Sequence, residues 1–146
     1  MLTNCGWFTM KIQQVKVWSY FAYAILLFVA PLRAHSETYG PFNYQIYGSY
    51  VEIDGCDSNT VMAVIPSNIE GYSVESIGVH AFSNCTSLAG VSFPQTVSTI
   101  QESAFEGCSS LTRAVYQGDV PSVFPDAFTG VHSNFVHYAR NGSSPD

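Results

Sequence analysis

The sequence predicts a repeat solenoid, a short array of coils that are mainly β-strand with short helical turns. Two observations predict it. The dipeptide Ala-Phe recurs at 81–82, 104–105 and 127–128, so both intervals are 23 residues. Seven positions are also identical between residues 77–99 and residues 100–122. An internal period of about 20 to 50 residues is typical of proteins whose equivalent coils stack on one another.

Inside each coil, the spacing of apolar residues predicts where the chain is extended. The pattern Leu-x-x-apolar-x-apolar occurs at 88–93 and again at 111–116, and it matches the L-x-x-L-x-L pattern of leucine-rich repeats. Side chains two positions apart lie on the same face of a strand, so Phe93 and Tyr116 should both enter the core. We therefore predict a short leucine-rich repeat array of about three 23-residue coils, with parallel neighbouring strands at these two segments.

The remainder of each coil should return the chain to the start of the next strand. Short return strands are predicted near 97–100 and 120–123. One or two helical turns should begin near His80 and Ser103. These turns lie between the return strand and the next Leu-containing strand.

The N-terminal end of the array differs from the regular coils. Residues 42–56 alternate apolar and polar side chains around Gly48, which predicts an N-terminal capping hairpin. The connection from Pro66 to Ile77 is five residues longer than its equivalent in the next coil. An inserted turn around Gly71 would accommodate the extra length.

The C-terminal end is less regular in sequence. Residues 135–139 are predicted to form the last strand, with Val136 and Tyr138 pointing inward. Residues 141–146, with the sequence NGSSPD, are predicted to be a disordered tail.

Two segments carry a resemblance to a known family. The strings IGVHAFSNCTSLAGVSFPQTVSTI and IQESAFEGCSSLTRAVY resemble the repeat of the BspA-like leucine-rich repeat surface proteins, whose unit contains Ile, Ala-Phe, Cys and Leu-x-x-Val-x-x-Pro. The resemblance extends over roughly residues 42–140. It implies protein binding and attachment to host or neighbouring-cell surface components. This chain has few units, and Val131 replaces the last cysteine, which favours a small stand-alone binder or a fragment of a longer array over multivalent adhesion.

Residues 1–36 are predicted to be a signal peptide. Lys11 and Lys16 precede an uncharged apolar run at 17–32, and small residues follow the run. A run of sixteen residues is shorter than the ~20 that a permanent membrane-spanning helix needs. Cleavage is therefore favoured over an uncleaved signal anchor.

Cleavage should occur after Ala34 or Ser36, and Met10 is an alternative start. The mature chain would then consist of a leucine-rich repeat domain at 37–140 and the tail, with no membrane span. We expect a secreted or cell-surface protein.

The charge distribution limits the partners. Lysine and arginine together number five, too few for a nucleic-acid-binding surface. From residue 35 onward there are two arginines, no lysine and eleven acidic residues. This negative charge should favour basic partners and repel anionic membranes.

The sequence contains no motif for catalysis, a cofactor or a metal. No Gly-x-Ser-x-Gly, Cys-x-x-Cys or His-Glu-x-x-His occurs, and the four histidines are scattered. Asp54, Asp57 and Asn59 lie close together but miss the alternate-residue spacing of a calcium loop, so a polar turn is the better interpretation. We expect no enzymatic activity.

The cysteines of the predicted domain allow more than one arrangement. Cys85 and Cys108 occupy equivalent positions of successive coils, where small buried thiols are favoured over a disulfide because the two Cβ vectors run parallel. Together with Cys56 they make an odd number, so one thiol should be free or pair with another chain.

The remaining candidate site is the outward side of the strands, because repeat proteins use exposed sheets to bind partners. A structural role, as a subunit of an envelope or secreted assembly without a separate ligand, is the alternative. Carbohydrate binding is a third hypothesis, carried only by a cluster of tyrosines in the cap, at positions 39, 44, 47 and 50. The outward residues that we predict to bind a protein are Met62, Val64, Gly90, Ser92, Arg113 and Val115.

Overall fold

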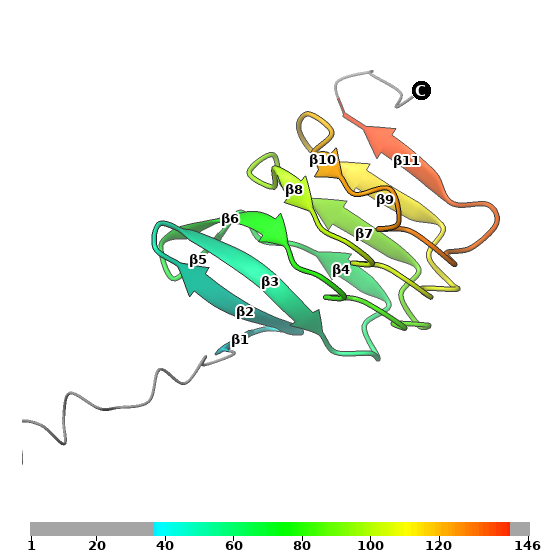
Figure 1. Cartoon of the computed structure of the whole chain (residues 1–146), viewed down its shortest axis with the longest axis horizontal. Helices are drawn as coiled ribbons and strands as arrows, with labels where there is room; N and C mark the ends of the chain where they lie inside the picture. The colour runs from blue at the N-terminus through cyan, green and yellow to red at the C-terminus, as the bar shows by residue number, and fades with distance from the viewer. Residues whose placement is uncertain (1–36, 141–146) are drawn as a thin grey trace, which may run out of the picture. The chain divides into compact units, whose positions relative to one another are not determined.

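A computed structural model describes residues 37–140 and confirms the predicted leucine-rich repeat solenoid (Figure 1). These residues form strands and turns and contain no helix. The predicted signal peptide at 1–36 and the predicted tail at 141–146 lie outside the described residues.

One side of the solenoid is a four-stranded parallel sheet, which we call sheet B. Its strand order is β11-β9-β7-β4. Gly90 pairs with Arg113, and Arg113 pairs with Val136, so successive strands are offset by one 23-residue period. There is one strand more than the three predicted coils, because the irregular first unit also contributes one. The strands are β4 (Met62–Val64), β7 (Gly90–Phe93), β9 (Arg113–Tyr116) and β11 (Val136–Ala139).

The opposite side is a seven-stranded sheet, which we call sheet A, with the order β1-β2-β3-β6-β8-β10 and β5 paired to β6. Its first three strands are antiparallel and include the predicted capping hairpin, β2–β3. Strands β3, β6, β8 and β10 are parallel, so the cap continues directly into the predicted return strands. The strands are β1 (Glu37–Tyr39), β2 (Phe42–Tyr47), β3 (Tyr50–Cys56), β5 (Asn68–Ile69), β6 (Tyr72–Ile77), β8 (Thr99–Ile100) and β10 (Ser122–Val123).

The predicted inserted turn is the hairpin between β5 and β6. Its two turn residues, Glu70 and Gly71, have φ angles of 52° and 87°. Two consecutive positive φ angles suit a tight hairpin, and glycine supplies one of them without steric penalty. The hairpin holds the additional residues outside the repeat, so Met62 of β4 still pairs with Gly90 of β7.

The predicted helical turns near His80 and Ser103 are wrong. Both residues have positive φ angles, 57° and 51°, which a right-handed helix does not allow. The N–H groups there alternate between two uses. The N–H of Phe82 donates to the carbonyl of Ala104 in the next coil at 2.7 Å, whereas neighbouring N–H groups close turns within their own coil. In a helix, every backbone N–H would donate within its own coil. In this segment every second N–H donates to the next coil instead, so the segment joins neighbouring coils.

The core is organised around aromatic rings that repeat with the coils. Phe82 and Phe105 stack at 4.7 Å, and Phe105 and Phe128 stack at 4.9 Å. These distances match the ~4.8 Å spacing of neighbouring strands. Phe93 and Tyr116 form a second stack at 5.3 Å on the sheet B side. The repeated Ala-Phe dipeptide therefore places one ring per coil in register with the backbone.

The orientation of the last strand also differs from the prediction. Val136 and Tyr138 were predicted to point inward, but they are 45% and 53% exposed. His137 pairs with the buried Ala114, and Ala139 pairs with the buried Tyr116, so these two residues face inward. Val136 and Tyr138 were assigned to the core because they are hydrophobic. The 23-residue register between strands decides instead which side chains of β11 enter the core.

The cysteines pack as the sequence favoured. Cys85 and Cys108 are buried, and none of the three cysteines within residues 37–140 forms a disulfide. The Cys108 thiol donates to the carbonyl of Phe82 at 3.0 Å. Burial raises the pKa of Cys108 to about 12, so the thiol stays protonated at neutral pH.

Polar side chains connect the cap to the array on the outer side of sheet A. The Ser76 hydroxyl donates to the Glu52 carboxylate at 2.8 Å. The Gln101 amide donates both to Glu52 and to Ser76. One carboxylate of the capping hairpin thus contacts two successive coils.

Replacing Phe105 by alanine should destabilise the fold by about 3 to 5 kcal/mol, because the ring is fully buried between two others. The matched control is Phe124→Ala, since the Phe124 ring is 47% exposed and its loss should cost less than about 1 kcal/mol. Urea unfolding followed by circular dichroism measures both. Equal losses for the two variants would show that the ring stack does not hold the coils together.

Candidate binding surface

The six residues predicted from the sequence lie together on the outward side of sheet B. Met62, Gly90 and Arg113 form one row across three strands, and a parallel row contains Val64, Ser92 and Val115. On β11, the first row continues with Val136 and the second with Tyr138. We call this surface the strand face, and it consists of Met62, Val64, Gly90, Ser92, Arg113, Val115, Val136 and Tyr138.

Val136 and Tyr138 were missed at the sequence level because both were assigned to the core. The signal that identifies them is the repeat period, since each lies 23 residues after a predicted face residue, Arg113 or Val115. Tyr138 also adds an exposed aromatic ring to this surface, whereas none of the six predicted residues is aromatic.

The exposed apolar side chains lie on the two outer strands of sheet B. Met62 and Val64 on β4 are 43% and 62% exposed, and the two β11 residues are similarly accessible. The middle strands present smaller or half-buried groups, such as Ser92 and Val115. The exposed apolar side chains of sheet B thus form two groups, one on β4 and one on β11, separated by the two middle strands.

Gly90 determines how Arg113 lies on this surface. Although Gly90 faces outward, it is buried beneath its neighbours. A Cβ atom at this position would lie 2.9 Å from the Arg113 Nε and 2.9 Å from the Met62 Sδ. The Arg113 Nη2 donates to the Met62 Sδ at 3.5 Å. The absence of a side chain at Gly90 therefore allows Arg113 to extend over β7 toward Met62.

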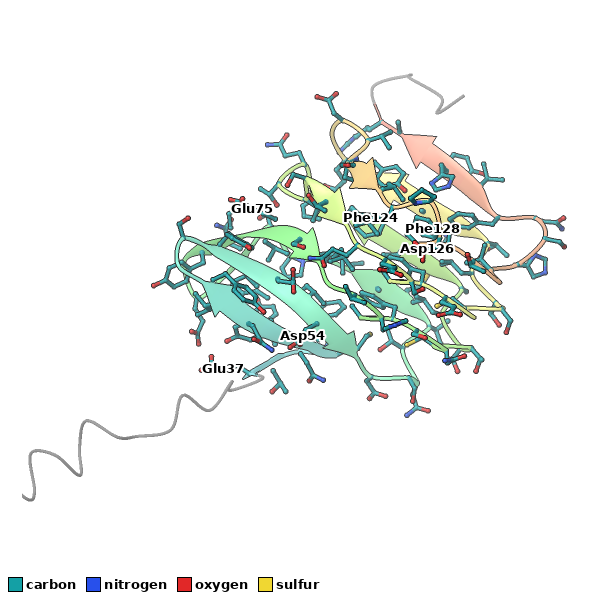
Figure 2. The ribbon with its side chains drawn as sticks, in the orientation of Figure 1. Glu37, Asp54, Glu75, Phe124, Asp126 and Phe128 are labelled. Carbon is teal, nitrogen blue, oxygen red and sulfur yellow. The ribbon has the colours of Figure 1, made fainter. Side chains whose placement is uncertain are left out.

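The charges of the described residues are segregated. Arg113 and Arg140 are the two positively charged side chains within 37–140 apart from histidine, and Arg140 directly follows β11. None of the ten acidic residues in this range lies on a strand of sheet B. Figure 2 labels Glu37 on β1, Asp54 on β3 and Glu75 on β6, all strands of sheet A. Arg113 has no ion-pair partner within this part of the chain.

The tyrosines of the cap do not form one cluster. Tyr44 is buried and donates to the Glu37 carboxylate at 2.8 Å. Tyr47 and Tyr50 stack with their ring centroids 5.8 Å apart. Tyr39 is 49% exposed on the first strand. Only part of the set that supported carbohydrate binding is therefore accessible.

The acidic residues near the cap are held by local hydrogen bonds. The Asp57 carboxylate accepts from the backbone and the side-chain amide of Asn59, at 2.9 and 3.1 Å. Asp54 accepts from the Gln45 amide at 2.8 Å. Asp57 and Asn59 thus form a polar turn. Between residues 37 and 140, no three His, Cys, Asp or Glu side chains are grouped so that they could hold a metal.

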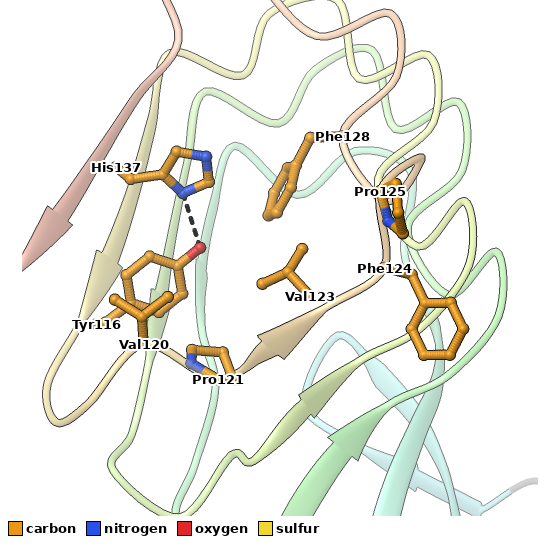
Figure 3. A pocket seen from close by; sticks show the side chains of 8 residues that line it. All are labelled: Tyr116, Val120, Pro121, Val123, Phe124, Pro125, Phe128 and His137. Carbon is orange, nitrogen blue, oxygen red and sulfur yellow. Dashed lines mark hydrogen bonds between the residues drawn. The ribbon is translucent and has the colours of Figure 1, made fainter. Parts of the chain in front are cut away.

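A hollow of about 350 Å³ lies where the last coil ends (Figure 3). On its wall, the Tyr116 hydroxyl and the His137 Nδ1 form a 2.8 Å hydrogen bond. Burial lowers the pKa of His137, so the imidazole is neutral at pH 7. The hollow is mainly apolar and is lined by Tyr116, Val120, Pro121, Val123, Phe124, Pro125, Phe128 and His137.

The repeat geometry agrees with a known family. A family model described as BspA type leucine-rich repeat region, in six copies, matches residues 59–138. The chain belongs to this BspA-type leucine-rich repeat family. The resemblance noted from the Ala-Phe and Cys positions is thereby confirmed. In the described part of this BspA-type protein, no helix has the length and hydropathy to cross a membrane.

Solved structures of bacterial leucine-rich repeat proteins are similar to this chain. A leucine-rich cell surface protein from Faecalibacterium prausnitzii A2-165 is 27% identical, with a TM-score of 0.61, over 69% of this chain and 29% of its own. A leucine-rich repeat protein from T. pallidum is 22% identical, with a TM-score of 0.54, over 73% of this chain and 55% of its own.

A third structure, a leucine-rich repeat protein from Bacteroides ovatus, is 21% identical, with a TM-score of 0.53, over 72% of this chain and 37% of its own. The two proteins with the lower identities show the fold alone. The chain thus spans between 29% and 55% of the length of these three proteins. A comparison with curated proteins found no match.

The half-buried His137 should make stability depend on pH. Its pKa is lower in the folded chain than the ordinary value of 6.5, so the unfolded state binds a proton more readily. The stability that neutral His137 contributes is complete above about pH 6.5 and is lost as the pH falls through the lowered pKa. Urea unfolding at pH 7.5 and 5.0 should therefore show a larger loss for the parent chain than for His137→Gln. Equal losses would mean that His137 does not couple folding to pH.

Proposed function

We propose that this BspA-type protein is secreted or displayed at the cell surface, where it binds a protein partner on a host or neighbouring cell through the strand face. One observation carries the proposal. Both outer strands of the parallel sheet B expose apolar side chains: Val64 on β4 and Tyr138 on β11 are more than half exposed, and Met62 and Val136 are 43% and 45% exposed. Exposed sheets of repeat proteins provide extended binding surfaces, and such a role in adhesion requires no catalytic group.

The surface location has two supports. The similar protein from F. prausnitzii is described as a cell surface protein, at 27% identity. The sequence also carries the basic residues and apolar run expected of a signal peptide, at residues 11–32. Both agree with a role outside the cell that produces the chain.

Val64→Glu should abolish partner binding, because it places a charge among the exposed apolar side chains of the strand face. Val79→Glu is the matched control, since Val79 is 48% exposed, lies outside sheet B and undergoes the same change of charge. Both variants and the parent chain would be immobilised to capture proteins from cell-surface extracts. We expect one protein to be retained by the parent and by Val79→Glu but not by Val64→Glu. Retention by all three would place the interaction on another surface.

A structural role in an assembly is the second candidate, and the apolar hollow of the last coil favours it. Phe124 lines the hollow and is 47% exposed, as expected of a surface that packs against another subunit. If the chain assembles in this way, Phe124→Glu should convert oligomers to monomers in analytical ultracentrifugation, and Val64→Glu should not. A parent chain that sediments as a monomer throughout the micromolar range would contradict this candidate.

A further inference from the structure

The strand face combines apolar groups with one unpaired cation. The Arg113 guanidinium carries five N–H donors, and its one hydrogen bond within the described residues is to a weak acceptor, the Met62 sulfur. Arg113 lies in the row between Gly90 and Val136, and Val115 follows it on the same face. A partner that covers the exposed apolar side chains must therefore also cover Arg113.

We infer that the partner presents a carboxylate to Arg113, so that the strand face recognises an acidic, otherwise apolar peptide segment. This inference rests on the proposed function. A guanidinium that loses water without gaining an acceptor is strongly unfavourable, whereas a carboxylate satisfies it with two parallel hydrogen bonds. A purely apolar partner would leave Arg113 buried and unpaired, and a basic partner would place two cations together.

The positive charge of Arg113 on the strand face is thus opposite in sign to the net charge of the described residues. Ten acidic residues against two arginines in the described range should attract basic molecules from a distance. None of the ten lies on a strand of sheet B, and Arg113 is the one charged side chain of the strand face. At contact distance, Arg113 therefore decides which charge is accepted.

The absence of a side chain at Gly90 lets the Arg113 side chain lie where this contact requires it. Because the Arg113 side chain lies over Gly90, part of its conformational freedom is already lost before binding. Gly90 has no positive φ, so alanine is compatible with its backbone. The added Cβ would displace the flexible ends of Arg113 and Met62 without changing any charge. Gly90→Ala thus tests the position of the Arg113 guanidinium separately from its charge.

The test is a selection of random twelve-residue peptides displayed on phage, against the full chain at physiological salt. Parallel selections use Arg113→Gln and Gly90→Ala, and circular dichroism verifies that all variants fold. Peptides selected by the parent should be enriched in Asp and Glu next to apolar residues. Their affinity, measured by fluorescence anisotropy, should fall at least about tenfold with Arg113→Gln. It should also fall with Gly90→Ala.

A double-mutant cycle tests whether Arg113 contacts the acidic residue of the peptide directly. Replacing the peptide's acidic residue by its amide should weaken binding to the parent but have little further effect on binding to Arg113→Gln. Enrichment in Lys and Arg, or in apolar residues alone, would overturn the inference. In that case, if Val64→Glu weakened binding of the selected peptides and Val79→Glu did not, the proposed function of the strand face would stand and only the inference about Arg113 would fail. Failure to select any peptide that Val64→Glu weakens would overturn both.

Discussion

The stacking of equivalent rings and strands at one common spacing is the constraint on which the rest of the structure depends. Phe82, Phe105 and Phe128 repeat at 4.7 and 4.9 Å, and the parallel strands impose nearly the same spacing on the backbone. Each coil is too thin to bury its own apolar side chains, so a coil is stable only when the next one lies in register. Side chains and backbone thus require the same 23-residue period.

The same register produces the outer surface. Because the inward positions of sheet B are aligned between coils, the outward positions between them are aligned as well. Arg113, Gly90 and Met62 meet in one row for this reason, although 51 positions separate the first from the last. The arrangement of the strand face is therefore a consequence of core packing, and its chemistry depends only on which residues occupy the outward positions.

The repeat period made most of the fold predictable. It predicted the regular strands β7, β8, β9 and β10, and the alternation around Gly48 predicted the cap, whereas β1 and β6 of sheet A were not predicted. The direction of Val136 and Tyr138 was mistaken because their hydrophobicity was given more weight than the period. The absence of helix near His80 depends on backbone hydrogen bonds between coils, which spacing alone does not reveal. The position of Arg113 over Gly90 likewise depends on side-chain conformation, although both residues were identified as outward-facing.

The β5–β6 hairpin shows where this architecture accepts changes in length. Its extra residues leave the solenoid at the corner before β6, while β4 and β7 remain paired on the opposite side. Insertions at such a corner do not disturb the stacked coils, whereas inserting one residue within a strand would turn the following side chains of that strand to the wrong face. The tip at Glu70 and Gly71 is therefore a suitable place to insert an epitope tag or a fluorophore, on the side of the molecule away from sheet B.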